Sequence, residues 1–197
     1  MKITDIKAQV KIPGHFSIFV DGKYSFSLSD TALLEEKLHV GYELDAAEVK
    51  RLKQVSSDDK LYGLALRYVS MRPRSEWELR SYLQRKSAPP ALADQILSKL
   101  SKLNLVDDMK FARAWVESRR LLRPTSKRKL QQELRAKRVN DEVIQQELAG
   151  DETDERALLR ELVAKKRSRY PDKLKLMQYL ARQGFSYDDI KAVIDEG

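Results

Sequence analysis

Residues 73–83 of this chain read Pro-Arg-Ser-Glu-Trp-Glu-Leu-Arg-Ser-Tyr-Leu, with leucines four residues apart at Leu79 and Leu83. Residues at i and i+4 lie on one face of an α-helix. Proline suits the first helical turn, because its missing N–H needs no partner there. Ser75 and Glu78 have the spacing of a capping box, which marks a helix start. The stretch therefore predicts a helix that begins near Ser75 and buries a leucine face.

The same pattern occurs twice more, 51 and then 46 residues further along the chain. The leucine pairs recur as Leu130/Leu134 and Leu176/Leu180, and Pro124 and Pro171 precede them. Apolar residues also recur fourteen residues before and after each pair, at Ala65, Val116 and Leu162 and at Leu97, Leu148 and Ile194. Helix triplets with a period near 47 residues predict a mainly α fold of tandem three-helix repeats, which form an elongated, curved array.

The segment before the repeats has a different pattern, because its apolar residues alternate with polar ones. Residues 6–12 and 16–20 predict two strands, and Asp21-Gly22 predicts a tight hairpin turn into a third strand at 24–28. The expected start of the mainly α chain is thus a small β-meander.

Two short helices follow this meander in the prediction. Ser29 or Asp30 can cap one that ends near Leu38, and Asp45 can cap another. The polar stretch 55–59 predicts a linker. The expected divisions are a β-containing segment at 1–59 and repeats at 60–108, 109–155 and 156–197.

Basic residues exceed acidic ones by 38 to 30, which gives a net charge of +8, and the whole excess lies in the helical repeats. It gathers at the predicted repeat junctions, in three clusters that occupy similar positions. Such clusters can track a phosphate backbone or pair with carboxylates of a protein partner, although a single cluster is commonly a solvated helix face. The predicted partner- or DNA-binding residues are Arg72, Arg74, Arg119, Arg120, Arg123, Lys127, Arg128, Lys165, Lys166, Arg167, Arg169 and Lys173.

Acidic residues are also patterned, because residues 139–155 hold seven of them and no basic one. We interpret this run as helix N-terminal caps plus a linker; discrimination against a wrong partner is the alternative. Three doublets could form metal or acid/base pairs, but helix capping is the favoured interpretation of each. These doublets are Asp58-Asp59, Asp107-Asp108 and Asp188-Asp189.

Three aromatic residues near the clusters raise the question of base stacking. Trp77 and Trp115 lie at apolar helical spacings and are expected in the core. Tyr170 lies inside the third cluster, where packing against Pro171 is favoured over base stacking.

The sequence lacks residues that several classes of function require. The chain has no cysteine, two histidines in its first 39 residues, and no glycine-rich phosphate loop, so no enzyme, cofactor or metal is expected. No run of 18 apolar residues and no signal-peptide pattern is present, which makes the cytoplasm the expected location and excludes a membrane partner.

Three stretches resemble the RecX family, the regulators of the bacterial RecA recombinase. They are Tyr-Val-Ser-Met-Arg-Pro-Arg-Ser-Glu-Trp-Glu-Leu at 68–79, Leu-Asn-Leu-Val-Asp-Asp-Met-Lys-Phe-Ala-Arg-Ala-Trp-Val at 103–116 followed by Arg119-Arg120, and Tyr-Leu-Ala-Arg-Gln-Gly-Phe at 179–185. The hairpin at 20–26 is similar to the β-containing extension of many members. One departure concerns the glycine after the middle helix, which is present as Gly184 but replaced near Ser87 and Arg138.

The resemblance implies tandem three-helix repeats and a non-enzymatic function. Family members bind RecA and its nucleoprotein filament and suppress filament growth, ATP turnover and strand exchange, and some bind DNA. Two further hypotheses are a stand-alone helical DNA-binding protein that competes for single- or double-stranded DNA, and a metal-dependent enzyme built on Asp107 and Asp108. We expect a monomer.

Overall fold

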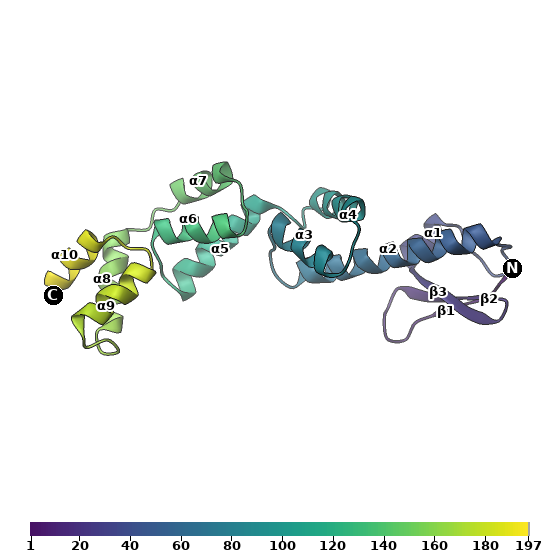
Figure 1. Cartoon of the computed structure of the whole chain (residues 1–197), viewed down its shortest axis with the longest axis horizontal. Helices are drawn as coiled ribbons and strands as arrows, with labels where there is room; N and C mark the ends of the chain where they lie inside the picture. Colours follow the sequence, from purple (N-terminus) through teal and green to yellow (C-terminus); the bar gives the residue numbers. More distant parts are fainter. Residues whose placement is uncertain (197) are drawn as a thin grey trace. The chain divides into compact units, whose positions relative to one another are not determined.

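The computed structural model describes residues 1–196 of the chain, which form a three-stranded sheet followed by ten helices (Figure 1). The strands are β1 (Ile3–Ala8), β2 (His15–Val20) and β3 (Lys23–Ser29). The helices are α1 (Asp30–Glu35), α2 (Ala46–Ser70), α3 (Glu76–Arg85), α4 (Pro90–Lys102), α5 (Asp108–Leu122), α6 (Lys127–Ala136), α7 (Asp141–Ala149), α8 (Glu155–Lys166), α9 (Lys173–Arg182) and α10 (Tyr187–Asp195). Two compact units result. One holds residues 1–70 and 82–98, and the other holds residues 71–81 and the chain from 99 onward.

The sheet is antiparallel with the strand order β1-β2-β3. Its tight turn is the predicted one, with Asp21 and Gly22 both at positive φ, as a type I′ turn requires. The first strand begins at Ile3, earlier than predicted, because the buried Ile3 side chain pairs in register with Val20. Val10 and Ile12, which the alternation placed in that strand, are exposed in the connection to β2.

Helix α2 runs without a break through residues 55–59, so the linker predicted there is wrong. Two of its polar side chains bind β3 instead of ending the helix. Ser56 Oγ hydrogen-bonds the backbone of Ser27, and both carboxylate oxygens of Asp59 accept from Ser29, at 2.6 Å from the amide and 2.8 Å from the hydroxyl. Asp59, predicted to cap a helix, thus attaches the sheet to α2.

We expect Asp59→Ala to weaken this attachment by about 1–3 kcal/mol, because the Ser29 donors lose a charged acceptor. Hydrogen exchange measured on β3 peptides should then speed up about tenfold or more at Ser29. Asp58→Ala is the matched control, since Asp58 accepts from Gln54 on the same helix, 2.8 Å away, and has no hydrogen bond to the sheet among residues 1–196. Equal exchange in the two variants would contradict the assigned role of Asp59.

The predicted leucine pairs all lie inside the fold. Leu79, Leu83, Leu130, Leu134, Leu176 and Leu180 are buried. Helices α5, α6 and α7 share one core, and α8, α9 and α10 share another, so the second and third repeats are each a three-helix unit with its own apolar centre.

The corner after each middle helix has the same backbone geometry in all three repeats. Gly184, Arg138 and Ser87 adopt positive φ angles of 93°, 57° and 59°. Each donates its amide to the carbonyl three residues earlier at 2.9 Å. The two departures from glycine therefore keep the left-handed corner, at the cost that non-glycine residues incur in that conformation.

Glycine is required only at the third corner. A methyl group on Gly184 would overlap Ser126 Oγ and lie 2.6 Å from Lys129 Cβ. We expect Gly184→Ala to lower the free energy of unfolding by at least about 2 kcal/mol, from backbone strain plus overlap.

Arg138→Gly is the opposite experiment, because it relieves the backbone strain of a non-glycine residue that adopts a left-handed conformation on the surface. We expect it to raise the free energy of unfolding by up to about 1 kcal/mol, apart from any contact that the side chain makes. Both changes can be measured by urea unfolding followed through tryptophan fluorescence. Similar effects of the two substitutions would show that the corner conformation does not govern stability.

Candidate partner interface at the repeat junctions

A shared contact joins consecutive repeats of the second unit. In the first two repeats, a hydroxyl before the middle helix donates to the carbonyl that ends the next middle helix. Ser75 Oγ donates to the Lys137 carbonyl at 3.1 Å, and Thr125 Oγ1 donates to the Gln183 carbonyl at 2.7 Å. These bonds satisfy carbonyls that a helix C-terminus leaves without partners.

A carboxylate completes each junction. Asp108, the first residue of α5, accepts from the Glu76 amide of α3 at 2.9 Å, and Glu155, the first residue of α8, accepts from the Lys127 amide of α6. Burial raises the pKa of Asp108, and the hydrogen bond from the Glu76 amide only partly counters this. The doublet prediction is half confirmed, because Asp107 caps its own helix α5 while Asp108 caps a helix of the preceding repeat.

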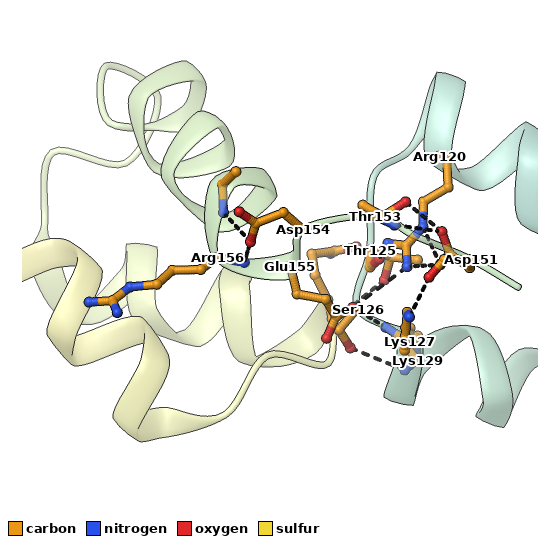
Figure 2. A network of polar contacts seen from close by, with 12 residues as sticks. Arg120, Thr125, Ser126, Lys127, Lys129, Asp151, Thr153, Asp154, Glu155 and Arg156 are labelled. Carbon is orange, nitrogen blue, oxygen red and sulfur yellow. Dashed lines mark hydrogen bonds and ion pairs between the residues drawn. The ribbon is translucent and has the colours of Figure 1, made fainter. Parts of the chain in front are cut away.

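Arg120, predicted to bind a partner, is instead enclosed in the junction between the second and third repeats (Figure 2). Its guanidinium binds both the Asp151 carboxylate and the Thr125 carbonyl, and lies 3.6 Å from Glu155. The side chains of Arg120 and Asp151 are only 13% and 7% exposed. Lys127 belongs to the same network, because its ammonium donates to the Asp151 carbonyl.

The pKa of Asp151 reflects this pairing. Burial alone would raise it, but hydrogen bonds from Arg120 and Thr153 outweigh burial, so the pKa lies below its ordinary value. The pair therefore stabilises the fold above the unfolded-state pKa of about 3.9, and this contribution is lost as the pH falls through the folded-state value.

Arg119 is also held within the second repeat. Its Nε donates to Glu133 at 2.7 Å, and its guanidinium lies over the Trp115 ring, 4.7 Å from the centroid. The Trp115 Nε1 donates to the same carboxylate at 2.9 Å, which confirms that Trp115 packs on the core of its repeat. Arg119 thus acts as an internal counter-charge.

Glu78 joins the first and second repeats. Its carboxylate accepts from Arg72 and, at 2.7 Å, from Lys137. Burial would raise the pKa of Glu78, but these two cations hold it below its ordinary value. Ser75 caps the Glu78 amide at 3.2 Å, as half of the predicted capping box. Arg72 remains exposed beside the pair.

The other residues predicted to bind a partner are exposed, paired with a neighbouring side chain, or half-buried. Arg123 and Arg128 are exposed, and the structure of residues 1–196 records no ion pair for either. In the third cluster Lys165 pairs with Glu161 at 3.3 Å, Lys173 pairs with Asp195 at 2.6 Å, and Arg169 lies over Tyr170. The remaining three are Arg74 and Lys166, which are half-buried, and Arg167, which is exposed.

One prediction for an aromatic residue is wrong, and another stays a prediction. Trp77 is exposed on α3, because it lies one residue off the buried Glu78 and Leu79 face. Tyr170 stacks on Tyr179 of α9 with ring centroids 5.1 Å apart, and its packing on the proline that follows it stays a prediction.

The acidic run 139–155 has the predicted caps and an additional role. Asn140 and Asp154 cap α7 and α8. Asp151 and Glu155, however, neutralise Arg120 and cap α6, which sequence reasoning missed. The adjacent basic and acidic runs were the available signal, because opposite runs on neighbouring helices can pair.

Residues 1–196 bring together no group of three or more potential metal ligands, and the carboxylates at the junctions are occupied by helix amides and guanidinium groups. Within that part of the chain, no helix is long and apolar enough to cross a membrane. The fold defines a helical-repeat protein with exposed cations near the junctions of its repeats.

Comparison with known proteins identifies the family. Four RecX family models match the chain in sequence order. They are the RecX N-terminal domain at residues 1–45 and the first, second and third RecX three-helix domains at 62–100, 107–148 and 153–194. The chain therefore belongs to the RecX family, whose members are non-enzymatic regulators of the RecA recombinase.

Individual relatives agree with this. The chain is 31% identical to "Regulatory protein RecX" of Listeria innocua over 97% of its own length and 74% of the relative's. It is 30% identical to that of Bacillus subtilis over 98% and 76%, and 32% identical to that of Lactobacillus johnsonii over 74% and 54%.

Two solved structures share the fold. A crystal structure of regulatory protein RecX matches with a TM-score of 0.75 and 28% identity, covering 98% of each chain. That of RecX from Lactobacillus salivarius matches with a TM-score of 0.59 and 26% identity, over 71% of this chain and 95% of the other.

The internal role of Arg120 leads to a stability prediction. We expect Arg120→Ala to lower the free energy of unfolding by about 3–5 kcal/mol, because it leaves the buried Asp151 carboxylate without its cation. Arg123→Ala, three residues further on, should change it by no more than about 0.5 kcal/mol. Urea unfolding followed by tryptophan fluorescence measures both. A small loss for Arg120→Ala would show that this arginine is available to a partner.

Proposed function

We propose that this chain binds the RecA–single-stranded DNA filament and limits its growth, ATP turnover and strand exchange. The observation that carries the proposal is the ordered match of all four RecX domains along one chain. In this proposal the chain acts in the cytoplasm as a monomer, and it regulates DNA repair and recombination without catalysing a reaction.

Exposed cations support this function physically. Arg123 and Arg128 flank the start of the second middle helix. Lys165 lies in the last turn of α8, the first helix of the third repeat, and Arg169 follows that helix. Repeated weak contacts to neighbouring filament subunits add up through high effective concentration, so no single contact needs to be strong.

The second candidate is a stand-alone DNA-binding protein that competes for the strand. It is favoured by the same exposed arginines, since each neutralised phosphate releases counterions. It predicts tight DNA binding without RecA and a steep fall in affinity with salt.

The deciding experiment is a titration of this chain into RecA ATPase on single-stranded DNA, with its own DNA binding recorded at the same salt. Inhibition at concentrations where the chain alone leaves the DNA unoccupied supports filament binding. If ATP turnover falls only where the chain coats free DNA, competition for the strand is the correct account and the proposal fails.

A variant pair tests the exposed arginines. We expect Arg123→Gln/Arg128→Gln to raise the concentration for half-inhibition of RecA ATPase at least fivefold, because two unpaired cations are removed from the second junction while the internal network stays intact.

Lys50→Gln/Lys53→Gln on α2 is the charge-matched control, because both lysines are exposed and lie outside the three clusters. It should leave half-inhibition within about twofold. If the control weakens inhibition as much as the arginine variant does, net charge and not the second junction governs the effect.

A further inference from the structure

The last turn of α5 exposes leucines where an ordinary amphipathic helix would bury them. Leu121 and Leu122 are 81% and 72% exposed. The inward face of α5 passes through Ala112 and Val116, and the helical period then brings Arg119 and Arg120 to the inward positions. Since those two arginines are bound within the fold, the leucines face solvent.

This arrangement differs from scattered surface leucines, which need no explanation. Two adjacent large apolar side chains are followed at once by the exposed Arg123 and then by Pro124. We call Leu121, Leu122 and Arg123 the apolar–basic corner.

The first repeat has a similar corner at the same place. Met71, which is 74% exposed, and the exposed Arg72 precede Pro73 as Leu122 and Arg123 precede Pro124. The third repeat differs, because the residue before its proline is Tyr170, which packs against Tyr179. An outward apolar side chain beside an arginine is therefore a shared feature of two junctions.

We propose that the apolar–basic corner binds the protein subunits of the filament and not its DNA, docking on an apolar hollow bordered by carboxylates. This inference rests on the proposed function and deepens it by naming the partner surface. A phosphate backbone offers a counter-charge to Arg123 but no apolar surface for two leucines. A protein surface offers both, and apolar anchors beside arginine are typical of the energetic centre of protein interfaces.

The test replaces the leucines without changing charge. Glutamine has nearly the helix propensity of leucine, so Leu121→Gln/Leu122→Gln should keep α5 intact, which circular dichroism checks. Leu174→Gln is the matched control, because Leu174 is 63% exposed on α9 outside the corner. Three properties are measured for each protein: affinity for RecA filaments on single-stranded DNA with a non-hydrolysable ATP analogue, affinity for the bare strand, and sedimentation.

We expect the double variant to bind the filament at least tenfold more weakly and the control to stay within twofold of the parent. Binding of both variants to bare DNA should be unchanged. Unaltered filament binding by the double variant overturns the inference. So does an equal loss on bare DNA, which would assign the corner to the strand, or a parent dimer that the double variant dissociates, which would assign it to a second copy.

Filament binding by the parent chain separates failure of the proposed function from failure of this inference. A parent chain that does not bind the filament removes the proposed function and this inference with it. If the parent chain binds the filament and the double variant binds it equally tightly, only this inference fails.

Discussion

A carboxylate at the start of one repeat accepts the hydrogen bond of the first amide in the middle helix of the repeat before it. Asp108 does this for α3, and Glu155 does it for α6. The first amides of a helix have no partner within the helix. Ser75 and Ser126 cap one amide each in α3 and α6, and the next repeat supplies the partner of a second amide, that of Glu76 or Lys127. Together with the hydroxyl-to-carbonyl contacts of Ser75 and Thr125, this bond places each junction's charged side chains.

The basic clusters consequently have two roles. Arg119 pairs with Glu133 within the second repeat, whereas Arg120 and Lys127 bind the Asp151 carboxylate and carbonyl inside the junction to the third repeat. Removal of these cations would leave their partners unpaired. Arg123, which directly follows the outward Leu121 and Leu122, and Arg128 remain on the surface. The +8 net charge is thus a poor guide to how much positive charge a partner meets, because part of the cluster is used by the fold.

The repeats, the hairpin turn and the leucine faces were predictable because they depend on local periodicity and on turn chemistry. The family also followed from residues 68–79, 103–116 and 179–185. The linker at 55–59 was mispredicted because Ser56 and Asp59 are polar for a tertiary reason, the attachment of β3. Sequence alone could not separate Arg120 from Arg123, since that difference depends on whether Asp151, thirty-one residues away, reaches the guanidinium.

Hydroxyl-radical footprinting of the chain on saturating RecA filaments tests the central claim most directly, because it reports the exposure of single side chains. We expect oxidation of Leu121 and Leu122 to fall sharply on the filament, compared with the free chain and with the chain on bare single-stranded DNA. Leucines that are oxidised as fast on the filament as in the free chain would contradict it.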